Sequence, residues 1–473
     1  MFVRAKNALY KQKLDWQIET KQLFALFCDK PWAMLLDSSR APHTDATFDI
    51  IAINPIATLT SDEGKCEFTP MNSEIAGLNL VLPTELSPLA TLAYVHQVLY
   101  PTQQASEHPF SVGAIGAWGY DLGRRSETLP IIANKDIHLN EMNIGFYDFC
   151  LVYSYKENRW YAYHYCGKSA LDIELKNIQS KLKNHTPSQP QKHPFKLTTA
   201  WQNQLTQQEY QQKFTQVQDY LLSGDCYQIN LTQRFEAHYE GDEWQAYCAL
   251  ASANKAPFSA FIRLPEHCVL SISPERFIRL HHNHIETKPI KGTMARSTNV
   301  ELDQLAASTL QASEKDRAEN VMIVDLLRND IGKVAAPGSV KVPSLFAIES
   351  FPAVHHLVST ITATLATDQN AFTLLQAAFP GGSITGAPKI RAMQIIEELE
   401  PSRRNLYCGS IGYVSQNGHM DTSITIRTLV TQHNVMYCWA GGGIVADSDV
   451  GSEYQESFDK VSKILPLLSQ LPK

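Results

Sequence analysis

Residues Ser259-Ala-Phe-Ile-Arg-Leu-Pro-Glu-His-Cys-Val-Leu-Ser-Ile-Ser-Pro-Glu-Arg-Phe-Ile-Arg-Leu-His281 contain three short apolar stretches separated by turn residues. The stretches Ser259–Arg263, His267–Ile272 and Phe277–His281 are typical of neighbouring strands. Around residues 303–330 the hydrophobic period changes to that of a helix. Strands and helices therefore come in blocks, which favours an α+β fold with antiparallel or mixed sheets over a parallel doubly wound sheet.

The same pattern extends over the rest of the chain. Short apolar runs at 32–36, 48–53 and 149–155 predict strands near the N-terminus, and 209–222 predicts a helix that ends at Ser223-Gly224. We expect one large sheet sandwich flanked by helices, in which N- and C-terminal segments are interwoven. The Pro-rich stretch Lys183–Pro194 marks a linker. The predicted regions are an N-terminal region at 1–182, a linker at 183–199 and a catalytic region at 200–473.

The composition excludes several classes of protein. The chain has 473 residues, with 41 Lys and Arg against 48 Asp and Glu, a net charge of −7. This sign argues against nucleic acid as a partner. No apolar run is long enough to span a bilayer, and the first residues lack a signal-peptide pattern. Nine scattered cysteines without a CxxC pair argue against a disulfide framework and a zinc site. We therefore expect a cytoplasmic location and no membrane contact.

A glycine-rich stretch, Phe379-Pro-Gly-Gly-Ser-Ile-Thr-Gly-Ala-Pro-Lys389, precedes a helical pattern. A phosphate-binding loop needs Lys and Ser/Thr directly after its second conserved glycine, and Ala387-Pro388 stand there instead. The free N–H groups at the start of this helix could bind a carboxylate. A purely structural turn before a packed helix explains the same residues.

Two glutamates are candidates for metal binding. Glu319 begins an apolar stripe on a predicted helix, so it is expected to be partly buried and in need of a cation or hydrogen bonds. Glu456 lies four residues before Lys460, which is also the spacing of an ordinary surface ion pair. Together the two carboxylates could hold one Mg²⁺ ion, which takes one or two protein carboxylates and completes its shell with water and ligand oxygens.

Residues 421–428 alternate so that Ser423, Thr425 and Arg427 share one face of a predicted strand. An arginine on such a face suits a bidentate carboxylate clamp, and a polar edge strand in water explains the pattern equally well. Glycines 441–443 would let the backbone approach a ligand closely, or would form a bulge.

Lys291 lies in a predicted turn between Pro289 and Gly292, and Glu275 lies 16 residues before it. Two adjacent strands could close this separation. A buried lysine with a lowered pKa is a nucleophile, and a nearby carboxyl group can serve as acid or base. Most lysines are instead solvated charges, so Lys291 alone would not indicate catalysis.

In order along the chain, these motifs resemble the chorismate-utilising enzymes, a family that includes anthranilate, isochorismate and salicylate synthases. The resemblance covers about residues 205–465, and the N-terminal part resembles the smaller sheet region of some members. Anthranilate synthases have a small residue where Pro289-Ile-Lys-Gly-Thr293 has its lysine. The resemblance therefore implies the branch that aminates ring carbon 4 of chorismate, for 4-aminobenzoate and folate synthesis. Anthranilate synthesis, or a non-catalytic tryptophan-binding regulatory module, remains the alternative.

The resemblance also implies a role for each site residue. Lys291 would be the nucleophile, Glu275 the general acid, and His356 a group near the leaving hydroxyl. Glu319 and Glu456 would hold Mg²⁺. The remaining substrate-binding residues would be Tyr413, Thr425, Arg427, Gly442, Gly443 and Lys460.

Two further ligands or partners are implied. Ser38 and Pro257-Phe258-Ser259 match parts of a tryptophan pocket in related proteins, whereas residues 42–47 depart from its pattern. The chain contains no pattern of a glutaminase domain. The resemblance therefore implies that ammonia comes from a separate glutamine amidotransferase subunit.

Overall fold

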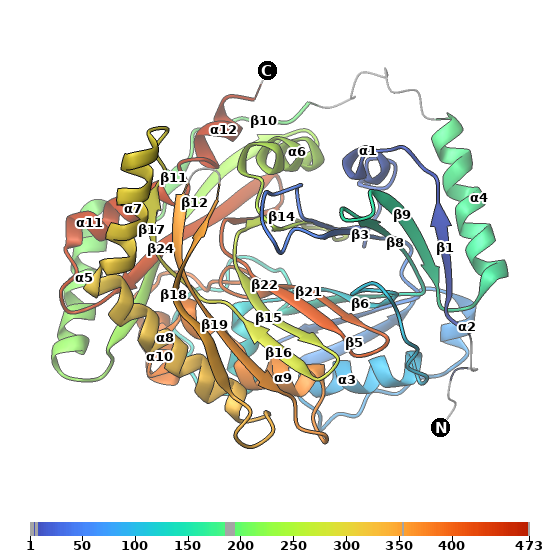
Figure 1. Cartoon of the computed structure of the whole chain (residues 1–473), viewed down its shortest axis with the longest axis horizontal. Helices are drawn as coiled ribbons and strands as arrows, with labels where there is room; N and C mark the ends of the chain where they lie inside the picture. Colours follow the sequence, from blue (N-terminus) through green and yellow to red (C-terminus); the bar gives the residue numbers. More distant parts are fainter. Residues whose placement is uncertain (1–3, 5–7, 185–193, 352–353, 472–473) are drawn as a thin grey trace.

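The computed structural model describes residue 4 and residues 8–184, 194–351 and 354–471. Two large sheets lie at its centre, with helices on their outer sides (Figure 1). The first sheet has 13 strands and the second has 11. This arrangement confirms the predicted α+β class with large antiparallel sheets.

The first sheet runs in the order β1-β9-β8-β3-β2-β13-β14-β23-β24-β12-β10, with β11 and β20 also paired to β12. Its strands are β1 (Tyr10–Leu14), β2 (Met34–Asp37), β3 (Phe48–Ala52), β8 (Phe149–Ser154), β9 (Arg159–His164), β10 (Lys196–Leu197), β11 (Gln202–Asn203), β12 (Gln228–Glu240), β13 (Phe258–Arg263), β14 (Cys268–Ser273), β20 (Gly386–Ala387), β23 (Thr428–Gln432) and β24 (Val435–Ile444).

The second sheet runs in the order β17-β19-β16-β15-β22-β21-β6-β7-β4-β5, with β18 also paired to β19. Its strands are β4 (Ala57–Asp62), β5 (Lys65–Pro70), β6 (Gly113–Trp118), β7 (Met142–Tyr147), β15 (Arg276–His281), β16 (His284–Thr287), β17 (Ile290–Ala295), β18 (Lys341–Ser350), β19 (Val354–Thr364), β21 (Ser410–Ser415) and β22 (Met420–Ile424).

Segments from both ends of the chain are interwoven in each sheet, as predicted. In the first sheet β2 pairs with β13, and in the second sheet β6 pairs with β21. The boundaries 1–182, 183–199 and 200–473 stay a prediction, and residues 185–193 lie outside the described part of the chain.

The helices cover the outer faces of the sheets, with α1 and α6 on one side and α3 and α9 on the other (Figure 1). Their bounds are α1 (Thr20–Phe24), α2 (Ser73–Ala76), α3 (Pro88–Leu99), α4 (Lys168–Asn184), α5 (Gln207–Leu222), α6 (Glu243–Asn254), α7 (Val300–Ala312), α8 (Glu314–Gly332), α9 (Ala371–Ala378), α10 (Lys389–Leu399), α11 (Val450–Asp459) and α12 (Leu465–Ser469). Among the described residues, no helix combines the length and apolar content needed to cross a bilayer.

Local sequence explains where several helices begin. Thr206 and Glu209 form a capping box that starts α5, within two residues of the predicted helix start. The helical pattern around 303–330 forms two helices, because Ser313 ends α7 and caps α8 by accepting a hydrogen bond from the Asp316 N–H. The glycine-rich stretch leads into α10, as predicted.

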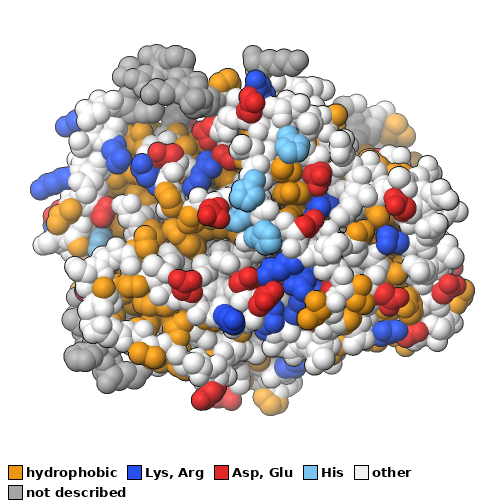
Figure 2. Space-filling model, turned by 180° about the vertical axis from the view of Figure 1, so that it is seen from behind, with side chains coloured by type: hydrophobic (Ala, Val, Ile, Leu, Met, Phe, Trp, Pro, Cys, Tyr) orange, Lys and Arg blue, Asp and Glu red, His pale blue; other side chains and the backbone are white. Residues whose placement is uncertain are grey.

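Hydrophobic packing joins the two sheets. One core cluster includes Met34 of the first sheet and Phe146 of the second, so it fills the space between them. A second cluster includes Leu35, on the opposite face of β2, together with Leu175 of α4 and Leu250 of α6. Figure 2 shows the face opposite to that of Figure 1, with acidic and basic side chains interspersed and hydrophobic ones in scattered patches.

The single strand predicted over 421–428 is wrong. β22 ends at Ile424 in the second sheet, and β23 begins at Thr428 in the first sheet. Between them Arg427 has a φ of 52°, in the left-handed region. The chain therefore crosses from one sheet to the other here, and simple alternation does not place Ser423, Thr425 and Arg427 on one face.

Candidate active site

Lys291 and Glu319 form an ion pair inside the fold. Lys291 lies in β17 rather than in a turn, and its Nζ atom is 2.8 Å from Oε1 of Glu319 in α8. Nζ also donates a hydrogen bond to the carbonyl oxygen of Ser383, at 3.1 Å. Burial lowers the pKa of Lys291 and is the largest single influence on it. The charge and hydrogen bond of Glu319, together with the charges of Glu275 and Glu456, outweigh burial, so the pKa of the amine is raised. In this state Lys291 therefore does not have the lowered pKa expected of a nucleophile.

Glu275 lies beside this pair, directly before β15. Its side chain is buried, and it accepts a hydrogen bond from Oγ of Ser383 at 3.1 Å. Burial raises its pKa to about 7, although the nearby charge of Lys291 opposes this shift. A carboxyl group with such a pKa can both give and take a proton near neutral pH. β15 and β17 are not adjacent, since β16 and β19 lie between them, and Ser383 joins the two side chains instead.

His356 and Arg427 lie on another side of the same group. Nδ1 of His356 in β19 lies 2.8 Å from Oγ1 of Thr293, which is its partner across the β17–β19 ladder. Burial and the charge of Arg427 lower the pKa of His356 to about 4, so the ring is neutral near pH 7. No carboxylate of the described residues lies within ion-pair distance of Arg427, which leaves its guanidinium available for an anion.

Three carboxylates converge over the glycines of β24. A Cβ atom added to Gly442 would lie 2.9 Å from Oε2 of Glu453 and 3.2 Å from Oε1 of Glu456. A Cβ atom added to Gly443 would lie 3.0 Å from Oε1 of Glu319. Glu453 and Glu456 belong to α11, which packs over this strand. The glycines therefore leave the room in which these oxygens meet.

The same carboxylates suit a hard divalent cation. Oε2 of Glu453 is buried and has no hydrogen-bond partner within the part of the chain that the structure describes. Burial also raises the pKa of Glu453. A buried carboxylate oxygen without a partner is costly, and a cation would satisfy it. Carboxylate oxygens are the ligands that Mg²⁺ prefers, so Glu319 and Glu456, with Glu453 beside them, fit such an ion.

Lys460 closes this side of the site. Its Nζ atom lies 2.7 Å from Oε1 of Glu456 and donates a hydrogen bond to the carbonyl oxygen of Gly441, also at 2.7 Å. The contact with Glu456 is the ion pair that their four-residue spacing allows. Its head group lies at the rim, where the side chains of both members of the pair are more than 40% exposed.

Sequence reasoning missed Gln228, and it assigned no role to Ser383 or Glu453. Nε2 of Gln228 in β12 donates a hydrogen bond to Oε1 of Glu319 at 2.7 Å, and the two residues lie 91 positions apart. Ser383 contacts both Lys291 and Glu275. No local pattern indicates these contacts. Glu453 did have a signal, because it lies one helical turn before Glu456 on the same face.

Tyr413 and Thr425 are not brought to this group of residues. The hydroxyl group of Thr425 is buried and donates to the carbonyl oxygen of Leu406. The side chain of Tyr413 lines a separate cavity together with Ile411, two residues before it on β21.

That separate cavity lies between the sheets and has a volume of about 280 Å³. The four residues of the predicted tryptophan pocket, Ser38, Pro257, Phe258 and Ser259, all line it. The guanidinium of Arg276 lies 5.0 Å from the centre of the Phe258 ring, and Asp45 and Asp421 pair with that guanidinium. The cavity therefore combines an aromatic wall with charges of both signs.

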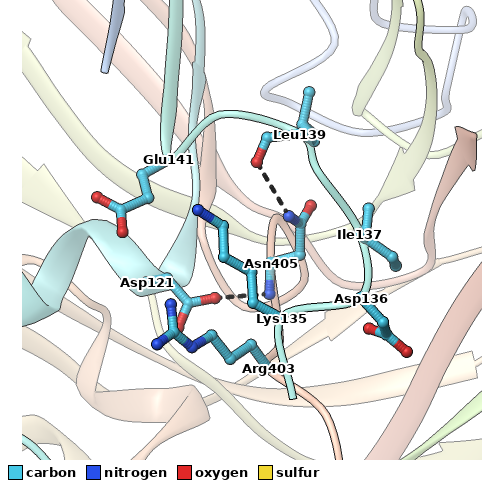
Figure 3. A pocket seen from close by; sticks show the side chains of 8 residues that line it. All are labelled: Asp121, Lys135, Asp136, Ile137, Leu139, Glu141, Arg403 and Asn405. Carbon is cyan, nitrogen blue, oxygen red and sulfur yellow. Dashed lines mark hydrogen bonds between the residues drawn. The ribbon is translucent and has the colours of Figure 1, made fainter. Parts of the chain in front are cut away.

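A third pocket is too small for a substrate. Figure 3 shows it beside Asp121 and Asn405, whose backbone N–H donates to the Asp121 carboxylate at 2.9 Å. Its volume of about 10 Å³ leaves room for one water molecule. The Lys291 group and the inter-sheet cavity are thus candidate sites for an organic ligand.

Comparisons with known proteins agree with this geometry. Residues 33–466 match the family described as chorismate binding enzyme. The chain is 51% identical over 458 residues to aminodeoxychorismate synthase component 1 of Salmonella typhimurium, covering 96% of each chain. It is 51% identical over 460 residues to the Escherichia coli protein of the same name, covering 97% of this chain and 98% of that one.

The structure also resembles solved structures. Anthranilate synthase component I from Streptococcus pneumoniae superimposes with a TM-score of 0.78 at 30% sequence identity, over 89% of this chain and 92% of that one. Sequence, fold and the convergent charged site agree, and the chain belongs to the chorismate binding enzyme family.

Proposed function

We propose that this enzyme aminates chorismate at ring carbon 4, giving 4-amino-4-deoxychorismate for 4-aminobenzoate and folate synthesis. The observation that carries this proposal is the place of Lys291, whose amine lies among Glu275, Glu319 and Ser383 rather than in solvent. The names of the relatives that are 51% identical support the same reaction.

In the proposed mechanism, Nζ of Lys291 attacks carbon 2 of the chorismate ring. The ring double bond shifts, and the hydroxyl group leaves carbon 4 as water after taking a proton. Ammonia then attacks carbon 4, and the lysine amine leaves carbon 2 by the reverse shift. The enolpyruvyl group is retained throughout. This covalent route replaces one difficult displacement by two easier ones.

Glu275 is suited to manage the protons of these steps. Lys291 is held as a cation by Glu319, so it must lose a proton before it can attack. Glu275 has a pKa of about 7 and shares Ser383 as a hydrogen-bond partner with Lys291. It can accept a proton when ionised and deliver one to the departing hydroxyl group. The neutral ring of His356 could receive a hydrogen bond from that group.

The residues that bind charge complete the proposal. Glu319 and Glu456 would hold Mg²⁺, with Glu453 next to them, and the bound ion would neutralise the ring carboxylate of the substrate. Arg427 would pair with the enolpyruvyl carboxylate, helped by backbone N–H groups near Gly442 and Gly443. Lys460 adds positive charge at the rim. Chorismate is a dianion, so a chain of net charge −7 needs such a local set of cations.

We further propose that ammonia is supplied by a glutamine amidotransferase subunit, in the cytoplasm. The relatives are named component 1, which supports a second component. The nine cysteines are free thiols, as expected in a reducing compartment.

We propose that the inter-sheet cavity binds tryptophan. The wall formed by Phe258 suits an aromatic ring. Asp45 and Asp421 could receive an amino group, and Arg276 could receive a carboxylate, so the cavity suits a free amino acid.

The deciding experiment incubates the purified chain with chorismate, Mg²⁺ and an ammonium salt, and identifies the product by mass. We expect 4-amino-4-deoxychorismate without released pyruvate. Anthranilate fluorescence together with pyruvate would contradict the proposal. The Lys291→Ala variant should lose the chorismate-derived mass adduct on the chain, whereas Lys341→Ala, at an exposed position of β18, should keep it. An adduct that persists in Lys291→Ala would remove Lys291 as the nucleophile.

A further inference from the structure

Three histidines gather where two hairpin turns of the second sheet meet, and the proposed reaction uses none of them. His281 ends β15, His282 follows it in the turn to β16, and His419 precedes β22. One ligating atom from each residue lies within 4.8 Å of the others. The ring centres are 4.4 Å apart for His281 and His419, 4.5 Å for His281 and His282, and 4.7 Å for His282 and His419.

Sheet pairing explains this gathering. β15 and β22 are antiparallel neighbours, with Leu280 opposite Met420, so the next residues along the ladder are His281 and His419. The two turns are more than 130 positions apart in the sequence, and only the fold brings them together. Glu275 lies at the other end of β15, about 20 Å away at the usual rise per residue. The cluster is therefore distinct from the catalytic group.

We propose that His281, His282 and His419 bind one transition-metal ion, with Zn²⁺ as the best candidate and a water molecule as the fourth ligand. Bonds of about 2.0–2.1 Å in a tetrahedral shell place ligand nitrogens roughly 3.3–3.4 Å apart. Nδ1 of His282 and Nε2 of His419 are already 3.4 Å apart. His282 is exposed and His281 is half-buried, so small side-chain rotations can bring the third nitrogen to the same distance.

The type of ligand separates this site from the carboxylate cluster over Gly442. Three imidazoles without a carboxylate suit Zn²⁺, Ni²⁺ or Cu²⁺, whereas carboxylate oxygens suit Mg²⁺. A metal ion here would link the β15–β16 and β21–β22 turns. It would therefore stabilise the pairing of β15 with β22 by adding its binding free energy to that of the folded state.

The test measures Zn²⁺ binding to the full chain after removal of any affinity tag and of bound metal. Titration in excess Mg²⁺ keeps the carboxylate cluster occupied. We expect one Zn²⁺ per chain, and visible absorption bands of a tetrahedral site when Co²⁺ replaces Zn²⁺. His282→Asn should weaken Zn²⁺ binding at least tenfold and remove the Zn²⁺-dependent rise in melting temperature.

His433→Asn is a matched control. His433 is also exposed in a two-residue hairpin turn, with a φ of 51° against 52° for His282, and it lies at the first sheet. Asn tolerates this backbone conformation, so neither substitution should strain its turn. Both variants also leave the buried His419 unchanged. Equal Zn²⁺ affinity in the two variants would overturn the proposal. The contact between His282 and His419 would then be only a hydrogen bond. Loss of Zn²⁺ binding in Glu456→Gln instead of His282→Asn would overturn it as well.

Discussion

The Nζ atom of Lys291 lies 2.8 Å from Oε1 of Glu319, and each residue changes the acidity of the other. Burial opposes ionisation of both groups, but their mutual attraction raises the pKa of the lysine and lowers that of the glutamate. In this state the amine is an ammonium group. Glu319 therefore restrains the proposed nucleophile until its charge is neutralised by something else.

Replacing Glu319 by Gln should test both its effect on the charge of Lys291 and its proposed role as a Mg²⁺ ligand. The amide cannot hold the lysine as a cation, so adduct formation with chorismate should shift to lower pH. It is also a poor Mg²⁺ ligand, so steady-state amination should fall on the order of 100-fold and lose its dependence on Mg²⁺ concentration. Glu314→Gln, at an exposed position of the same helix, is the control and should behave as the wild type. Unchanged Mg²⁺ dependence in Glu319→Gln would contradict the assignment.

Glu275 predicts how the reaction depends on pH. Its carboxyl group must be protonated to give a proton to the departing hydroxyl group, and its pKa is about 7. The proposed route also needs Lys291 to lose its proton, so the single-turnover rate of adduct formation at saturating chorismate should rise with pH up to about 7 and then level off. The Glu275→Gln variant should be slower by roughly 10²–10⁴-fold, and its rate should keep rising above pH 7. A plateau from pH 7 that persists in the variant would assign the titration to another group.

The same glutamate should reduce stability at high pH. Its folded-state pKa of about 7 is higher than the ordinary value of 4.5, so folding favours the protonated form. Its favourable contribution is complete below pH 4.5 and is lost as pH rises to 7. Glu275→Gln cannot ionise, so its melting temperature should exceed that of the wild type by roughly 1–3 °C at pH 8. The difference in melting temperature should shrink at pH 5. A difference that is the same at both pH values would show that ionisation of Glu275 does not cause it.

The inter-sheet cavity predicts a ligand effect on stability. Tryptophan should raise the melting temperature of the wild type in thermal unfolding, because a ligand that binds the folded state stabilises it. Phe258→Ala should abolish this rise by removing the aromatic wall. Phe68→Ala is a matched control, since Phe68 is also a half-buried strand residue but lies outside the cavity. No rise in the wild type would exclude tryptophan as the ligand.

Sequence patterns predicted the parts of this protein that depend on local periodicity. The strands at 32–36 and 149–155, the α5 helix and the position of Glu319 on a helix follow from spacing that a single segment displays. The interweaving of the two halves is confirmed by strand pairing, although no single segment displays it. The ion pair between Glu319 and Lys291 was not predicted, because it depends on how distant segments fold together.

The errors arose where tertiary structure overrides a local pattern. The alternation over 421–428 suggested one strand, but the chain changes sheets between Ile424 and Thr428. Gln228 could not be found at all, because a glutamine in a buried strand has no signature until its distant partner is known. Burial alone suggested a low pKa for Lys291, and the direction reversed because a carboxylate lies within hydrogen-bonding distance.

The junctions β2–β13 and β6–β21 give the chain a property that its linker would not suggest. β2 precedes the linker and pairs with β13, which follows it, and β6 pairs with β21 in the same way. Without its partner from the other half of the chain, each of these strands would have an open edge. Producing either half separately would expose unpaired N–H and C=O groups along both edges, which invites aggregation. Shortening, fusion or exchange of parts between relatives is therefore best planned around whole sheets and not around the linker.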